Sequence, residues 1–120
     1  MAGFKRFEDI QAWQAARKLT FLVNDFCAEG PASRNFAFRN QICGAAMSSM
    51  SNIAEGLGRN TDKDFAHFLD IAKASAMEVQ SLLYVALDMK YLDDEHFRQL
   101  YVLADETASM IGALIKYLRK

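Results

Sequence analysis

This 120-residue chain has little proline, little cysteine and almost no net charge, and each of these absences narrows the choice of fold. The chain has a single proline, Pro31, and no run of alternating apolar residues bounded by turn signals, which favours helices over strands. Its two cysteines, Cys27 and Cys43, have no metal-ligand spacing and do not make a disulfide framework. We therefore expect two reduced thiols in a cytoplasmic protein.

The charges nearly balance, with 14 basic and 15 acidic residues and a net charge of −1. This balance gives no general attraction to nucleic acid or to an anionic membrane. No stretch is long and apolar enough to span a bilayer, so we expect no membrane partner. The first nine residues include Lys5, Arg6, Glu8 and Asp9 and lack an apolar core, so no signal peptide is expected.

Apolar residues, in contrast, are abundant: they make up 52% of the chain, at the upper end of the range for soluble proteins. A single domain over residues 1–120 has only a thin core in which to bury them. Four segments carry apolar residues at steps of three and four, which predicts an all-α, up-down-up-down antiparallel four-helix bundle. The first expected helix runs from about Asp9 to about Ala28, and the second begins between Ser33 and Phe36 and ends at about Glu55. The third begins at Thr61 or Asp62 and follows an apolar stripe that reaches Met89. The fourth begins after Leu92 and ends at about Lys120.

Short polar residues mark the expected beginnings of these helices. Asp9 is placed to cap the first helix, and Thr61 with Asp64 approximates a capping box for the third. Asp93 or Asp94 is expected to cap the fourth helix, whose first turn is acidic, as the helix dipole favours.

Glycines mark the expected ends. Gly30 suits a left-handed cap before Pro31, and Gly56 is the expected stop of the second helix. Gly44 lies inside that helix, where glycine costs about 1 kcal/mol relative to alanine. We therefore expect a neighbouring backbone or ring to approach Gly44 closely.

The third helix is expected to be apolar over roughly 200° of its circumference, because two adjacent stripes run along it. A surface helix of a monomer has a narrower apolar arc. The excess predicts that the protein associates with copies of itself as a homo-oligomer. The stripes are Phe65, Leu69, Ala72, Ala76, Val79, Leu83 and Ala86, and Phe68, Ile71, Ser75, Glu78, Leu82, Val85 and Met89.

The segment from Asn52 to Arg59 combines an amide, a carboxylate and two glycines at the expected end of the second helix, whose side chains are otherwise small. Glu78 falls inside the apolar arc of the third helix, where an unpaired carboxylate carries a large desolvation cost. We therefore predict a polar network that sets the register of these two helices. Its members are Asn52, Glu55, Arg59, Ser75 and Glu78.

With these segments placed, the chain resembles the four-helix-bundle family of 23S rRNA intervening-sequence proteins (S23-like). The resemblance rests on Phe7–Ile10, Trp13, Gln14 and Ala16, on Gln41, Ile42, Ala45 and Ala46, on Ser51–Gly56 with Gly58 and Arg59, and on Phe65, His67–Leu69, Ile71, Ala72, Ser75 and Glu78. It implies a ring-like homopentamer without enzymatic activity. It also implies a relation to the accessory variability determinant proteins of diversity-generating retroelements, which bind nucleic acid and a reverse transcriptase.

The chain departs from the family pattern where members often carry two basic residues, because Cys43 and Gly44 stand there. Met50 replaces a proline that members often have. The first departure removes positive charge and so weakens the expectation of nucleic-acid binding.

Enzymatic and metal chemistry have little support. The pairs Asp64 and His67, and Asp93 and His96, approximate the carboxylate–histidine spacing of di-metal bundles but lie in or near first turns. Neither histidine has an obvious partner for nucleophilic catalysis. The Gly56–Asn60 turn lacks the lysine–serine pair of a phosphate loop. We expect no catalytic residue, metal or other cofactor.

The sequence thus favours a non-enzymatic, cytoplasmic homo-oligomer that serves as a scaffold or interaction module, with itself and a protein partner as the expected partners. The alternative is an accessory protein that binds RNA or DNA through a basic strip. The candidate contacts of that strip are Arg17, Lys18, Arg34, Arg39 and Arg59.

Overall fold

The computed structural model describes residues 3–120, which contain helices and no strand. This confirms the all-α class. A short 3-10 helix, η1, precedes four long α-helices and one short one. The bounds are η1 Phe7–Asp9, α1 Gln11–Ala28, α2 Gly30–Arg34, α3 Phe36–Leu57, α4 Asp62–Asp88 and α5 Asp94–Leu118.

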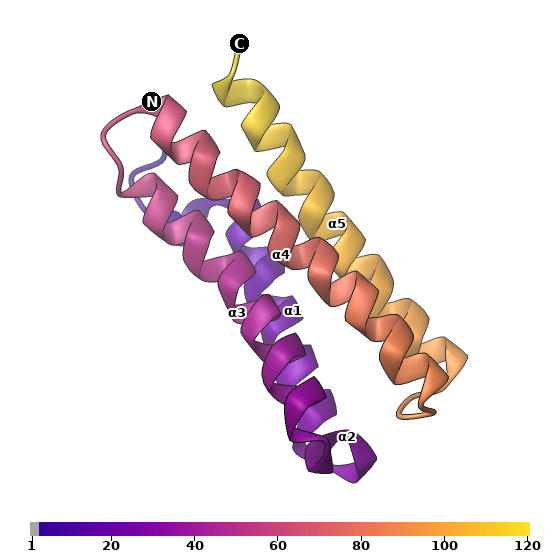
Figure 1. The fold of residues 1–120 in the computed structure, drawn as a ribbon. Helices are drawn as coiled ribbons and strands as arrows, with labels where there is room; N and C mark the ends of the chain where they lie inside the picture. The colour runs from indigo at the N-terminus through magenta and orange to yellow at the C-terminus, as the bar shows by residue number, and fades with distance from the viewer. Residues whose placement is uncertain (1–2) are drawn as a thin grey trace.

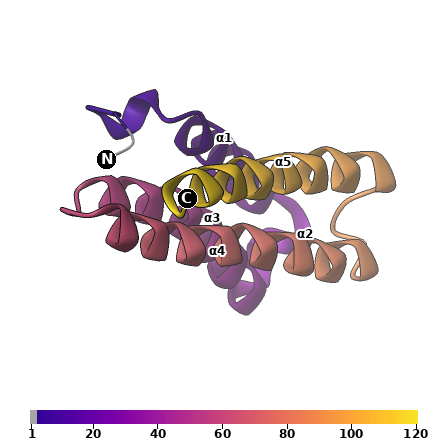
Figure 2. The same cartoon turned by 90° about the horizontal axis from the view of Figure 1, so that it is seen from above.

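The four long helices form an elongated bundle of 44 × 21 × 19 Å (Figure 1). Helix α3 packs against α1 and α4, and α5 packs against α4 and α1, so the last helix closes onto the first. Figure 2 shows α4 and α5 running side by side. The α3–α4 connection and the C-terminus lie at one end of the bundle, and α2 lies at the other (Figure 1). This arrangement is the predicted up-down-up-down topology.

Two predicted caps are present. The Thr61 side chain accepts a hydrogen bond from the Asp64 backbone N–H at 3.1 Å, and α4 begins at the next residue, Asp62. Of the two candidates for α5, Asp93 is the cap, because its carboxylate accepts a hydrogen bond from the His96 N–H at 2.8 Å. Each of these bonds satisfies a backbone donor that the first turn of a helix leaves without a partner.

The prediction for Asp9 is wrong. Asp9 belongs to η1, and Ile10, which makes no side-chain cap, occupies the N-cap position of α1. The Ile10 N–H donates to the Phe7 carbonyl at 3.0 Å, and this tight turn places the Ile10 side chain in the core. Gly30 does adopt a left-handed backbone, with φ of 73°, after α1 ends. Pro31 then opens the short helix α2, in whose first turn proline is tolerated.

The prediction that Gly56 stops the second helix is also wrong, because α3 continues to Leu57. Gly56 is buried, and a Cβ atom there would lie 2.8 Å from Cδ1 of Phe65 and 2.9 Å from Cβ of Phe68. Glycine is therefore needed here for the close approach of the first two turns of α4. At Gly44 the opposite holds: an added Cβ would meet nothing within 4 Å, so no part of residues 3–120 makes the expected close approach.

The core consists of two apolar clusters separated by a narrow polar layer. In this layer Ser49 and Thr107 are fully buried. Their hydroxyls donate to backbone carbonyls of their own helices, at 2.6 Å and 2.7 Å, which removes the cost of burying them. Large side chains fill the core on either side. One cluster is centred on Leu19, Val23, Ile42, Val79, Leu83 and Leu100, and the other on Ile10, Trp13, Ile53, Phe65, Leu69 and Ile111.

Candidate interaction surfaces

A serine bridge joins α3 to α4 near the middle of the bundle. The hydroxyl of Ser75 lies 2.9 Å from the Ser48 hydroxyl, within hydrogen-bonding distance. Asn52 donates from Nδ2 to the Ser48 carbonyl at 2.9 Å and to its hydroxyl oxygen at 3.0 Å. The structure therefore brings Asn52 and Ser75 together, but through Ser48, which the sequence reasoning treated only as one small residue among several.

The other three residues of the predicted network lie elsewhere. Glu78 is exposed rather than buried, and it accepts a hydrogen bond from Gln41 Nε2 of α3 at 3.1 Å. Glu55 is exposed, and among residues 3–120 it makes no hydrogen bond to Asn52 or Glu78. The Arg59 guanidinium lies 4.5 Å from the ring centre of Phe68. The five residues therefore do not form one network, because Glu78 lies toward solvent at the edge of the α3–α4 contact.

Exposed apolar side chains of α4 border these polar links. Ile71, Val85 and Met89 are 39%, 41% and 56% exposed. Helical spacing places Ile71 one turn before Ser75 and Val85 two turns beyond Glu78, both on the side of α4 that meets α3. On α3, small residues lie three or four positions from Gln41 or Ser48, which places them on the side of α3 that meets α4. We call this surface the α3–α4 face: Ala37, Gly44 and Ser51 of α3 with Ile71, Val85 and Met89 of α4.

The five basic candidates do not form a single strip. Arg17 and Lys18 lie on α1, Arg34 ends α2, Arg39 lies in the first turn of α3, and Arg59 follows the end of α3. From Arg39 to the last residue of α3, Leu57, the helix advances 18 residues, or about 27 Å at 1.5 Å per residue, and Arg59 lies beyond that end. Arg59 is therefore at the opposite end of the bundle from Arg34 and Arg39.

Three of these arginines rest on aromatic rings. The guanidinium carbon of Arg17 lies 5.8 Å from the Trp13 ring centre, and that of Arg39 lies 4.9 Å from Phe36. Arg59 is held over Phe68 in the same way. Cation–π contacts of this kind hold a guanidinium in place while leaving its edge available for hydrogen bonds.

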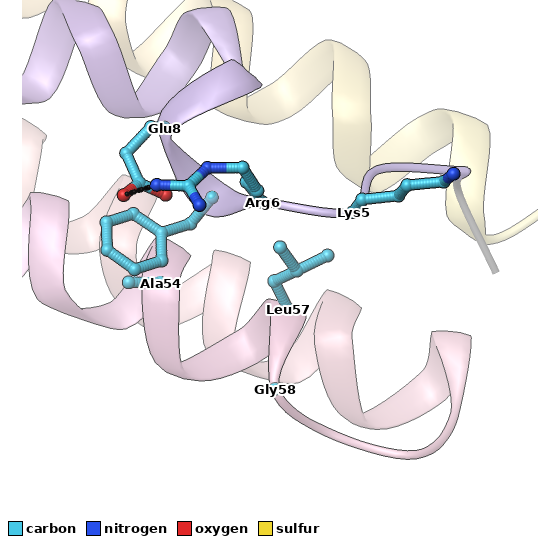
Figure 3. A pocket seen from close by; sticks show the side chains of 7 residues that line it. Lys5, Arg6, Glu8, Ala54, Leu57 and Gly58 are labelled. Atoms are coloured by element: carbon cyan, nitrogen blue, oxygen red, sulfur yellow. Dashed lines mark hydrogen bonds and ion pairs between the residues drawn. The ribbon is translucent and has the colours of Figure 1, made fainter.

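A surface cavity of about 380 Å³ lies between the N-terminal segment and the end of α3, beside the segment from Asn52 to Arg59 (Figure 3). It is lined by Lys5–Glu8, Ala54, Leu57 and Gly58. The Arg6 guanidinium is 2.7 Å from the Glu8 carboxylate, so its charge is neutralised within the cavity. The carbonyl end of a helix repels anions. The Glu8 carboxylate and the carbonyl end of α3 therefore oppose an anion here, and Lys5 is the lining cation that is not paired with Glu8.

The histidines lie apart from one another. The His96 ring packs edge-on against Phe26 with ring centres 5.7 Å apart, and His67 contacts Phe68 in the same way at 6.0 Å. Within residues 3–120, no three His, Cys, Asp or Glu side chains lie close enough to hold a metal ion. In the same part of the chain, no helix is both long and apolar enough to cross a membrane.

Comparison with known proteins places the chain in a family. The model of the 23S rRNA-intervening sequence protein family matches residues 8–113. A protein of unknown function from the S23 ribosomal protein family of Bacteroides thetaiotaomicron has a similar structure, with a TM-score of 0.79 over 88% of this chain and 98% of that one. The two are 19% identical, so this likeness shows a shared fold. The comparison with curated proteins gives no match. On the family match over residues 8–113, the chain belongs to the 23S rRNA-intervening sequence protein family.

Proposed function

We propose that this protein is a non-enzymatic homo-oligomer that acts as a scaffold or interaction module, and that five copies form it, as the family resemblance implies. The observation that carries the proposal is the α3–α4 face. This face exposes three large apolar side chains beside a row of small residues, and the contact of these apolar side chains with water is unfavourable. A partner covering this face would remove the unfavourable contact with water.

A second copy of the chain fits this face because the two helices offer complementary shapes. Gly44 is unfavourable inside a helix by about 1 kcal/mol, and, apart from its neighbours along the helix, no atom of residues 3–120 lies within 4 Å of the position that a Cβ would take there. An approaching helix from another copy gives the glycine a role, since small residues let helix axes come close. Bulky Val85 and Ile71 of one copy would pack against the small residues of α3 in the next.

Contact between two different patches of one surface is heterologous, and copies joined in this way close into a ring when the rotation between neighbours allows it. In such a ring, the residues of one patch contact a different patch of the neighbouring copy and not the same residues in it. This is the arrangement expected when the apolar residues lie on one helix and the small residues on its neighbour.

Two valine substitutions test this proposal. We expect Val85→Asp to dissociate the oligomer, because the new carboxylate would lose its hydration in the interface. Val102→Asp is the matched control, since Val102 of α5 is 46% exposed and lies outside the α3–α4 face. Sedimentation velocity on both variants measures the change. An oligomer that survives Val85→Asp, or that is lost equally in both variants, would contradict the assignment of this face.

The alternative function, nucleic-acid binding, is supported by an uneven distribution of charge. Residues 3–61 carry seven basic and five acidic side chains, whereas residues 62–120 carry seven basic and ten acidic ones. The half that contains α1 to α3 is therefore positive although the whole chain is not. Arg17 and Lys18 are consecutive exposed residues of α1, and they are the best-placed pair for a phosphate backbone.

Anisotropy titrations with labelled single-stranded RNA between 50 and 200 mM salt test this alternative. Arg17→Glu with Lys18→Glu should weaken binding and lower the salt slope by about 1.4 if both side chains contact phosphates. Arg98→Glu with Lys116→Glu makes the same change of charge on α5 and serves as the control. Absence of binding at 50 mM salt, or equal loss in both double variants, would remove the alternative.

A further inference from the structure

The two cysteines, although 16 positions apart in sequence, lie at one surface cavity between α1 and α3. The cavity has a volume of about 340 Å³, and both thiols line it. Cys27 of α1 is 2% exposed at its base, and Cys43 of α3 is half-buried and so reaches solvent. The remaining lining residues are Asn24, Ala28, Arg39 and Asn40.

The packing of α1 on α3 holds the two sulfur atoms together. The Thr20 hydroxyl of α1 lies 2.9 Å from the Ala46 carbonyl of α3, within hydrogen-bonding distance, which fixes the two helices against each other beside the cavity. Burial, together with the neighbouring Cys43 thiol, raises the pKa of Cys27 to about 12, so Cys27 is a protonated thiol at neutral pH. The accessible sulfur, Cys43, is therefore the one that meets an external reagent first.

Arg39 supplies a fixed positive charge at the cavity. Its guanidinium donates from Nη1 to the Ser33 carbonyl at 3.1 Å and rests on the Phe36 ring. This charge acts on the Cys27 sulfur in the direction that favours a thiolate. A guanidinium and two amides, those of Asn24 and Asn40, also suit a reagent that carries carboxylates.

We propose that Cys27 and Cys43 form a redox-active dithiol that reacts with low-molecular-weight disulfides such as glutathione disulfide and closes into an intramolecular disulfide between α1 and α3. The Cys43 thiolate attacks one sulfur of the reagent, the reagent's S–S bond breaks, and one thiolate leaves. Cys27 then gives up its proton to the thiolate expelled in the first step, and its sulfur attacks the Cys43 sulfur, breaking the mixed disulfide and releasing the second thiolate, which takes up a proton from water. In total the protein loses two protons and two electrons, and the reagent takes up both as it becomes two thiols.

Closure would tie α1 to α3 around the 15 residues from 28 to 42, a segment that contains α2. A cross-link of this length stabilises a protein chiefly by restricting its unfolded chain. We expect the oxidised protein to melt roughly 10 °C above the reduced one. In a reducing cytoplasm the pair would be reduced at rest and oxidised only when the thiol pool is depleted.

The test treats folded, reduced full-length protein with glutathione disulfide at neutral pH, followed by acid quenching, alkylation and mass spectrometry. The wild type should lose 2 hydrogens and yield a linked peptide pair containing Cys27 and Cys43. Cys27→Ala should stop at a glutathione adduct on Cys43, because the resolving sulfur is gone. Cys43→Ala should remain unmodified, because its remaining thiol is buried.

Several results would overturn the proposal. One is a wild-type protein whose thiols both stay reduced, and another is a stable Cys43 adduct that never closes. Disulfides between chains in place of the internal one would count against it equally. Circular dichroism melts of oxidised and re-reduced wild type supply an independent check that needs no variant: equal melting temperatures would contradict the predicted cross-link.

Discussion

Gly56→Ala tests how tightly α3 and α4 are packed at the end of the bundle where the α3–α4 connection lies. An alanine Cβ at this position would lie 2.8 Å from Cδ1 of Phe65, 2.9 Å from Cβ of Phe68 and 3.2 Å from the Phe65 carbonyl oxygen. Phe65 is fully buried, so its ring can shift only if the core side chains around it shift as well. The two helices would have to separate by several tenths of an ångström.

Two opposing effects set the magnitude. Replacing glycine by alanine inside a helix stabilises it by up to about 1 kcal/mol. Overpacking a well-filled core costs about 1–3 kcal/mol, and contacts of a rigid Cβ with a buried ring and a backbone oxygen belong at the upper end. The overpacking cost exceeds the gain in helix stability, and we expect a net loss of about 1–2 kcal/mol, which corresponds to a fall in Tm of roughly 4–10 °C.

Urea unfolding at one fixed protein concentration measures the effect, since self-association makes stability depend on concentration. Gly112→Ala is the matched control. Gly112 also lies inside a long helix, α5, but its added Cβ would meet only the flexible end of Lys73, at 3.4 Å from Nζ. We expect that variant to gain about 0.5–1 kcal/mol. A Gly56→Ala protein as stable as the wild type would refute the close approach of the helices.

Two smaller effects follow from helix ends and a surface ion pair. Asp93→Ala should lower the free energy of unfolding in urea by about 1 kcal/mol, because it removes the cap of α5. Asp94→Ala is the control, since it leaves that cap intact, and equal losses in the two variants would contradict the capping role of Asp93. The Arg119 guanidinium donates two hydrogen bonds to the Asp70 carboxylate. These bonds are the main reason why the pKa of Asp70 is lowered. The pair therefore stabilises the fold above the ordinary Asp pKa near 4 and loses this effect as the pH falls through the lower folded value. Arg119→Gln should thus destabilise slightly at pH 7, and the difference from the wild type in thermal melts should shrink as the pH is lowered below the ordinary Asp pKa; a difference that does not change with pH would contradict this assignment.

Periodicity predicted the long helices well because their apolar residues are dense and regular. Thr61 and Asp93 were also predictable, since a short polar side chain before an apolar run satisfies local backbone donors. Asp9 is also a short polar residue before an apolar run. The start of α1 is determined instead by the neighbouring Ile10, whose side chain lies in the core. That position depends on packing between distant segments, which local sequence does not encode.

The polar residues between α3 and α4 were harder to place for the same reason. Counting along the helix put Glu78 inside an apolar arc, but an arc of 200° is wider than the buried side of α4, and Glu78 falls on its exposed margin. Ser48 gave no signal because serine is common in helices with small side chains. Its bond with Asn52 joins residues one turn apart on α3, whereas its contact with Ser75 exists only through the packing of α3 on α4.

The native mass of the purified wild-type protein shows whether the chain associates with copies of itself. Sedimentation equilibrium or light scattering, at several concentrations, gives this mass without any substitution. We expect a single closed assembly of five chains of 13.5 kDa each. A species of 13.5 kDa at all concentrations would contradict it, because the α3–α4 face would then remain uncovered in solution.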